Sequence, residues 1–401
     1  MKKSFLFILG LTLLACTPDG GKNERGIINL SPTEKVISKQ SNNFAFGLLD
    51  ATNTTLANNS QVVVSPLSAS MALSMAMNGA NGETLNEMMD ILGFNGTTIN
   101  EVNTFNNKLM KGLVQLDNTA KINIANSLWL NNITALDTYK QTITEMYDAE
   151  IFTQDFTLDA INGWCSKATN GKIGSMYSKL AKDLRFLLLN AIYFKASWAT
   201  PFTSIEDATF ITENGEKQIV PFMNGKHYAK YYECGKFNIY GIPYGNEAFT
   251  YYIAMPNEGV SMNECTAELA TGSWDDATTI ENAMFKGFID LNLTMPMYET
   301  NFKADLVEAL KYMGINKAFS EAAEFPRIFN EGNVAISQVL QATTFKVDEL
   351  GAEASAVTSV EGEITANYHE KIKLVVDRPF IFFVQEQSTG TILFAGKIGK
   401  I

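Results

Sequence analysis

Hydrophobic residues first recur at helical spacing in the N-terminal third of the chain. Residues 43–49 carry large apolar side chains on one helical face, which predicts an amphipathic helix. Ser65 before Pro66 is a favourable helix start. The run that follows to Met77 is apolar on nearly all sides, which predicts a buried helix.

Two further helices are predicted from capping and periodicity. A Thr-x-x-Glu box at residues 84–87 predicts the start of a short helix that ends near Gly93. Residues 304–313 are amphipathic and are followed by Gly314, which predicts another helix.

Continuous apolar runs predict strands. Residues 184–198 (LRFLLLNAIYFKASW) are too continuously apolar for a surface element, and we predict a central strand. Residues 380–384 and 392–395 predict two strands joined by a turn at 388–390. No linker interrupts the alternation of helix and strand, so we predict one mixed α and β domain over residues 35–401.

Composition and charge restrict the classes of partner. The chain has 401 residues, of which 46% are hydrophobic and 18% charged, a balance that excludes wholesale disorder. Length alone would suggest two or three domains of about 150 residues. The net charge is 31 − 43 = −12, which argues against nucleic acid or an anionic membrane surface as the main partner, because both require clustered Lys and Arg.

Few residues are available for catalysis or metal binding. The two histidines, His227 and His369, exclude a three-His zinc site, and any catalytic triad would have to use one of them. The sequence lacks G-x-S-x-G, H-E-x-x-H, the phosphate loop and the dinucleotide signature. His227 follows Gly225 in a polar stretch, which predicts a solvated side chain, and the same holds for His369. We expect no enzyme, no metal and no cofactor.

The N-terminus has the pattern of an export signal. Lys2 and Lys3 precede an apolar run at residues 5–15 that is too short to span a bilayer as a permanent helix. The run ends in Leu-Leu-Ala-Cys16, which resembles the lipobox of bacterial lipoproteins; an ordinary signal peptide with an incidental cysteine is the alternative. We expect residues 1–15 to be removed and Cys16 to be lipidated, which places the protein in the bacterial cell envelope, at the outer membrane or the cell surface.

A short tether is predicted between the anchor and the domain. Residues 16–34 are rich in Gly, Pro and polar types, which is typical of a flexible segment. No later stretch reaches the about 18–20 apolar residues of a spanning helix. We therefore expect membrane contact through the lipid anchor only.

The remaining cysteines, Cys165, Cys234 and Cys265, have no CxxC spacing. Their odd number leaves at least one unpaired within the monomer, although an exported protein meets an oxidising compartment. We predict a structural role for all three.

A long loop lies between two hydrophobic strand-like runs near the C-terminus. About twenty residues after Gly351 carry few large apolar groups, and loops this long are usually functional or disordered. Read as a strand, the loop alternates, and one face carries only small uncharged residues, namely Ala352, Ala354, Ala356 and Thr358. The charged Glu353 falls on the opposite face. This pattern would let the segment lie inside a sheet, which argues against a merely flexible excursion.

The hinge of this loop is recognisable. The stretch Glu349-x-Gly351-Ala-Glu353-Ala-Ser-Ala-Val-Thr358 resembles the hinge of the reactive-centre loop of the serpins, the serine protease inhibitor family. Further similar segments follow the family's order through nearly the whole mature chain, at residues 65–68, 78–84, 124–129, 189–195, 377–380 and 390–396. The resemblance implies an α+β fold, a single serpin domain with three β-sheets, about eight or nine helices and an exposed reactive-centre loop over about residues 352–371.

The resemblance also implies a mechanism. Serpins are single-use traps: a protease attacks a bait bond and forms an acyl-enzyme, and the cleaved loop then inserts into the main sheet before water can release the protease. Such a native state is kinetically rather than thermodynamically stable. The small uncharged face favours an inhibitor over a storage or carrier serpin, because a buried unpaired charge in the inserted loop would cost several kcal/mol.

Residues outside the loop also match the family. Ser65, Ser68 and Asn190 match a buried polar cluster under the region where the sheet opens. Gln341 stands where many members have His, and it can still donate and accept hydrogen bonds. Trp198 matches the family's breach region.

Counting from Gly351 places the bait bond between Thr365 and Ala366. The part of the loop up to Pro379 is long for the family, so a slip of one to three residues remains open, with Ile364 and Tyr368 as alternates. No Lys or Arg lies between Ala352 and Glu370, which argues against trypsin-like targets.

Three functions follow as alternatives. The first is a monomeric inhibitor of elastase-like or subtilisin-like serine proteases. The second is a non-inhibitory binding protein whose loop is cut as a substrate. The third is an inhibitor of papain-like cysteine proteases, whose clefts also accept small and aliphatic residues.

Overall fold

The computed structural model describes residues 24–56, 59–154, 156–175, 177–180, 184–271, 285–329, 334–351 and 370–401. Several predicted site residues lie outside this part, and they remain predictions from sequence. They are Cys16, Ala352, Glu353, Ala354, Ala356, Thr358, Ile364, Thr365, Ala366, Tyr368 and His369.

The described residues contain eight α-helices and one 3-10 turn at Lys317–Phe319. The helices are α1 (Pro32–Thr55), α2 (Pro66–Met77), α3 (Gly82–Ile91), α4 (Ile99–Leu113), α5 (Asp137–Tyr147), α6 (Leu158–Ala168), α7 (Met262–Ala270) and α9 (Val307–Met313). In this part of the chain no helix is long and apolar enough to cross a membrane.

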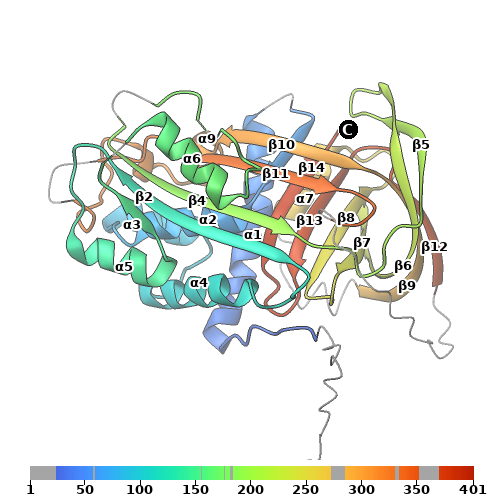
Figure 1. The fold of residues 1–401 in the computed structure, drawn as a ribbon, viewed down its shortest axis with the longest axis horizontal. Helices are drawn as coiled ribbons and strands as arrows, with labels where there is room; N and C mark the ends of the chain where they lie inside the picture. Colours follow the sequence, from blue (N-terminus) through green and yellow to red (C-terminus); the bar gives the residue numbers. More distant parts are fainter. Residues whose placement is uncertain are drawn as a thin grey trace, which may run out of the picture.

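Strands in the described residues form three sheets. They are β1 (Gln61–Val64), β2 (Lys121–Leu130), β3 (Glu150–Phe152), β4 (Phe186–Lys195), β5 (Ser204–Ile211), β6 (Lys217–Cys234), β7 (Phe237–Tyr244), β8 (Phe249–Pro256), β9 (Phe285–Pro296), β10 (Tyr298–Asp305), β11 (Leu340–Val347), β12 (Glu370–Val375), β13 (Phe380–Glu386) and β14 (Ile392–Ile398). The largest sheet has the order β1-β14-β13-β8-β7-β6-β9-β12, with β5 on β6, and the others are β10-β11 and β3-β2-β4. The predicted α+β fold with three sheets is confirmed (Figure 1).

Several predicted elements are confirmed. Residues 43–49 lie within α1, and α2 begins and ends as predicted, with the Ser65 side chain accepting from the Ser68 N–H at 3.3 Å. The predicted C-terminal hairpin is the antiparallel pair β13–β14. Local capping and hydrophobic periodicity suffice for these elements because each signal lies within the element itself.

Two helix starts are wrong. α3 begins at Gly82 after Asn81, and the Thr84 side chain accepts from the Glu324 N–H at 3.0 Å instead of capping the helix. α9 begins only at Val307, because residues 304 and 305 pair with β11 as the end of β10. In both cases a tertiary partner uses the residues that the local pattern assigned to the helix.

The predicted strand at 184–198 exists as β4, but its central position is wrong. β4 pairs antiparallel with β2 on one edge, and no ladder covers its other edge in the described residues. The apolar run reflects burial on both faces, since Leu188 packs with the main core and Leu187 with the cluster around α6. Burial of faces and pairing of edges are independent, and only the first is visible in the sequence.

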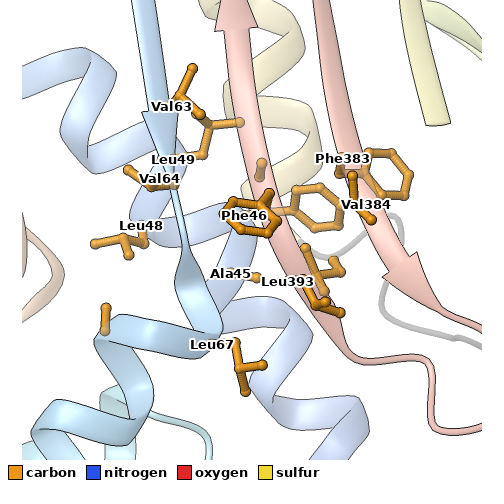
Figure 2. Packing of buried hydrophobic residues seen from close by; sticks show 14 of the residues in the cluster. Ala45, Phe46, Leu48, Leu49, Val63, Val64, Leu67, Phe383, Val384 and Leu393 are labelled. Atoms are coloured by element: carbon orange, nitrogen blue, oxygen red, sulfur yellow. The ribbon is translucent and has the colours of Figure 1, made fainter. Parts of the chain in front are cut away.

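The main core lies between α1, α2 and the β1–β14–β13 side of the large sheet (Figure 2). The Phe46 ring of α1 meets the Phe383 ring of β13 edge to face, with centroids 5.3 Å apart. Leu48, Val64 and Leu393 are buried around this contact. This side of the large sheet is thus closely packed against α1 and α2.

The flexible tether predicted for residues 16–34 is wrong from residue 24 onward. The Gly26 N–H donates to the Leu116 carbonyl at 3.0 Å, and the buried Ile28 donates its N–H to Ser388 Oγ at 2.9 Å. Ser31 then caps α1 with a complete capping box. Gly and polar residues suggest flexibility, but here one isoleucine and backbone hydrogen bonds fix the segment to the domain.

Candidate functional site: the edges of β4 and β11

In the part of the chain that the structure describes, β4 and β11 run parallel beside each other without a ladder between them. At one end, Leu187 and Leu188 of β4 and Val339 before β11 line a common cavity. At the other end, residues just after β4 pair with residues just after β11. Both strands therefore point the same way, as they do in Figure 1, yet the described residues place them in different sheets.

Hydrogen bonds hold the two strands together where the long loop leaves β11. The Trp198 N–H donates to the Leu350 carbonyl at 3.1 Å, and the Phe202 N–H donates to the Glu349 carbonyl at 3.2 Å. The buried Trp198 also donates its indole N–H to the Asp348 carbonyl at 2.8 Å. Its ring stacks on the Tyr244 ring, with centroids 4.4 Å apart. The predicted breach residue Trp198 thus bonds the residues on either side of the predicted hinge residue Glu349.

Gly351 is the last described residue before the loop, and its backbone requires glycine. Its φ is +129°, a conformation that other residues rarely adopt. A Cβ there would lie 2.2 Å from the Ala196 carbonyl oxygen and 2.5 Å from the Ser197 Cα. The loop therefore starts from a tight turn packed on the backbone that follows β4.

The four predicted cluster residues meet at the start of α2. Gln341 of β11 accepts the Ser65 N–H at 2.9 Å and donates its amide to the Ser65 carbonyl at 2.8 Å. Ser68 donates its hydroxyl to the Asn190 carbonyl of β4 at 3.3 Å. All four are buried, so the first turn of α2 bonds β11 on one side and β4 on the other.

The polar cluster extends to residues that the sequence analysis did not identify. The Asn190 amide donates to Asn126 Oδ1 of β2 at 2.7 Å, and the Asn126 amide donates to the Tyr147 carbonyl at 2.7 Å. Tyr147 in turn donates its hydroxyl to Asn103 of α4 at 2.7 Å. A signal existed, because Asn126 is a polar residue in a strand that ends in the apolar run at residues 128–130, but its partners are distant in sequence.

The space between the first residues of β4 and the segment just before β11 is mainly apolar. A cavity of about 20 Å³ is lined by Ala72, Leu73, Ala76, Leu187, Leu188, Ile336, Gln338 and Val339. This volume is close to one water molecule. The strands are therefore closely packed here, and a new strand would have to separate them.

The arrangement offers two parallel strand edges to one incoming strand. In the described residues no ladder joins the facing edges of β4 and β11, and free strand edges accept further strands. A chain that leaves β11 at Gly351 and folds back would run antiparallel to both. Binding would need no cofactor and no catalytic group, and no cluster of metal-ligating residues is found in the described part of the chain.

The three described cysteines carry no reactive thiol. Cys165, Cys234 and Cys265 are buried. Burial raises the pKa of the Cys165 and Cys234 thiols to about 12 and that of Cys265 to about 11. The thiols stay protonated at neutral pH, which agrees with the predicted structural role.

The solvated side chain predicted for His227 is wrong. The ring is 4% exposed and packs on Phe202, with centroids 4.5 Å apart. Within the described part of the chain neither ring nitrogen has a hydrogen-bond partner. The alternation of β6 turns residue 227 inward between the exposed Lys226 and Tyr228, and a polar sequence neighbourhood does not reveal this.

Because His227 is buried, stability is expected to depend on pH. Burial lowers the pKa of His227 from 6.5 to about 4. The unfolded chain then binds a proton that the folded protein excludes, so the free energy of unfolding falls as the pH drops from 6.5 to 4, by about 3 kcal/mol in total. Thermal unfolding of wild type and His227→Phe between pH 7 and 4 should show a smaller acid loss in the variant. Parallel curves would contradict this assignment.

Comparisons with known proteins agree with this architecture. A family model described as serpin (serine protease inhibitor) matches residues 39–401. Iripin-1 of Ixodes ricinus is 30% identical over 358 residues, which cover 85% of this chain and 89% of the relative. The native state of the thermophilic serpin Tengpin gives a TM-score of 0.82 at 29% identity over 93% of this chain and 95% of that chain. Its latent state gives 0.77 at 27% identity over 93% and 99%. The chain belongs to the serpin family of protease inhibitors.

Proposed function

We propose that the protein inhibits serine endopeptidases by covalent trapping. After cleavage, the segment that follows Gly351 inserts between β4 and β11 as a new strand. The observation that carries this proposal is the pair of facing parallel edges directly at the start of the loop, which no ladder joins within the described part of the chain. The higher TM-score to the native than to the latent state of Tengpin is consistent with a chain poised before insertion.

Insertion would release enough free energy to drive the trap. β4 has ten residues, so a strand of similar length would gain ladder bonds on both of its edges. At a net value of about 1 kcal/mol per hydrogen bond, the gain is on the order of 10 kcal/mol. This energy is withheld while the intact loop is held at both ends, at Gly351 and Glu370.

The bait is proposed at Thr365–Ala366, with Ile364 and Tyr368 as alternates. The segment between Ala352 and Glu370 contains no Lys or Arg. It therefore cannot fill the specificity pocket of a trypsin-like protease, which requires a cation. A β-branched residue followed by alanine suits elastase-like or subtilisin-like proteases.

Incubation with pancreatic elastase, subtilisin and papain, with trypsin as control, tests the proposal. We expect an SDS-resistant complex with elastase or subtilisin and a released peptide that begins at Ala366. Trypsin should form no complex. Rapid cleavage without complex, and without a rise in thermal stability after the cut, would contradict covalent trapping.

Two alternatives give different results in the same assay. A non-inhibitory serpin-fold protein would be cut as a substrate and leave the protease active. A papain-like target would give a complex with papain instead. The small residues of the loop suit papain-like clefts too, which is why this enzyme belongs in the panel.

We also propose that the protein is anchored in the cell envelope through a lipid on Cys16. The lipobox-like sequence before Cys16 supports this. Glu24 is held by its carbonyl, which accepts the Asn246 amide at 3.1 Å. Eight residues span at most about 28 Å, so the inhibitor would stay close to the membrane surface.

A further inference from the structure

An exposed aromatic pair lies on the outer face of the sheet beside the end of the long loop. Tyr228 of β6 is 42% exposed and Phe288 of β9 is 41% exposed. Their rings stack with centroids 4.8 Å apart and an interplanar angle of 7°. The next residues, Ala229 and Ile289, are buried at 0% and 2% exposure, so the alternation of a regular sheet turns two large aromatics into solvent.

Lysines surround this pair on the same face. The register places Tyr228 opposite Asp290 and Asp290 opposite Lys371. Further along, Lys226 lies opposite Asn292, and Asn292 lies opposite Lys373. The three lysines are exposed, and in the described residues none of them forms an ion pair. Lys230, which lies opposite Phe288 and donates to Gln387, is on this face too. Four lysines and one aspartate make the face locally basic on a chain with a net charge of −12.

The patch lies next to the point where the loop rejoins the sheet. β12 begins at Glu370, which pairs with Ile289, the residue after Phe288. The proposed bait residue Thr365 lies five residues earlier, which is at most about 18 Å of chain. A protease of about 230 residues has a radius of about 22 Å. A protease bound at the bait bond would therefore extend over the patch, and the same holds for the alternates Ile364 and Tyr368.

We propose that the patch formed by Tyr228, Phe288, Lys226, Lys371 and Lys373 is a second contact for the target protease. It fits a protease surface with an apolar spot bordered by carboxylates. Exposed aromatics supply the contact area that interfaces favour, and the lysines accelerate encounter with an acidic partner. This inference rests on the proposed function, since it takes the protease to be the molecule that attacks the loop.

The double variant Tyr228→Ala/Phe288→Ala tests the patch. The measured quantity is the second-order rate constant for consumption of the intact protein, counting complex and cleaved product together, with subtilisin and pancreatic elastase. We expect at least a tenfold fall for the protease that consumes wild type faster, with an unchanged thermal midpoint. Tyr312→Ala is the matched control, because Tyr312 is 62% exposed on α9 and outside the patch.

Charge reversal gives a second readout. Lys226→Glu/Lys373→Glu should also slow consumption, and the rate should lose its dependence on ionic strength if the protease presents carboxylates. Rates within twofold of wild type in both double variants would overturn the proposal. A wild-type dimer that the aromatic variant dissociates would also overturn it, because the patch would then be a contact between copies.

The two proposals fail in different ways. If wild type is only cleaved and forms no complex, covalent trapping is wrong, and a slower cleavage of the aromatic variant still supports the patch. If wild type forms complex and the aromatic variant does so at the same rate, covalent trapping stands and the patch proposal is wrong. If no protease consumes wild type at all, both are overturned.

Discussion

Replacing Thr358 by arginine is expected to abolish complex formation and turn the protein into a substrate. Thr358 belongs to the small uncharged face of the loop. On insertion this face would lie over α2 and the core beneath β4 and β11, where Ser68 and Asn190 are buried. An arginine there would either carry a buried charge or keep the segment out of the sheet, and either cost is several kcal/mol.

The measurement is the number of inhibitor molecules consumed per protease molecule inhibited, read from denaturing gels. For Thr358→Arg we expect this number to rise more than tenfold, because slow insertion lets water release the protease first. The bait sequence is unchanged, so the rate of the first cleavage should remain within about twofold.

Ser355→Arg is the matched control for this experiment. It adds the same charge three residues away, on the opposite face of the alternation. We expect its complex yield to stay close to wild type. If both arginine variants trap the protease as wild type does, the face argument fails. If both fail equally, charge in the loop matters irrespective of face.

Gly351→Ala is expected to destabilise the native state at the root of the loop. The added Cβ would meet the Ala196 carbonyl oxygen at 2.2 Å, and the backbone φ of +129° is unfavourable for alanine. Neither neighbour is a side chain that can move aside, so the turn must shift and weaken the bonds from Trp198 and Phe202. We expect a loss of at least about 2 kcal/mol and a lower unfolding midpoint in urea.

Gly96→Ala separates the two causes. Gly96 also has a positive φ of +80°, but a Cβ there meets nothing within 4 Å. The decrease in the free energy of unfolding of Gly96→Ala therefore measures the backbone cost alone. Gly351→Ala should show a clearly larger decrease. Equal losses would show that contact with the backbone of Ala196 and Ser197, just after β4, is not what fixes Gly351. Inhibitory activity during incubation at 37 °C should also fall faster in Gly351→Ala, since the trap depends on kinetic stability.

Sequence signals within a single segment correctly predicted the elements that depend only on that segment. Ser65 and Pro66 determine where α2 begins, and the two apolar runs near the C-terminus determine the β13–β14 hairpin. The helix start predicted at Thr84 was wrong because the Thr84 hydroxyl accepts the backbone N–H of Glu324, 240 residues away. The composition of residues 24–31 wrongly suggested a flexible segment, because their hydrogen-bond partners lie just after α4 and in the β13–β14 turn.

The candidate site divides in the same way. The resemblance selected Ser65, Ser68, Asn190 and Gln341, and the structure brings all four to the first turn of α2. Asn126, Tyr147 and Asn103 continue the same hydrogen-bonded chain and were not predicted, because their partners come from separate helices and strands. His227 was misplaced because strand alternation, rather than neighbouring polarity, decides which way it points.

The sequence by itself determined the family, the single mixed domain and the alternation of small residues in the loop. These depend on the order of residue types, which is visible without coordinates. Only the tertiary structure decided that, in the described residues, no ladder covers the edge of β4 that faces β11. It also decided that α2 bonds both strands and that Tyr228 and Phe288 emerge beside the start of β12. The hydrophobic pattern indicates which faces of an element are buried. The pairing of strand edges, and which side chains lie side by side on a sheet, depend on contacts between residues far apart in the chain.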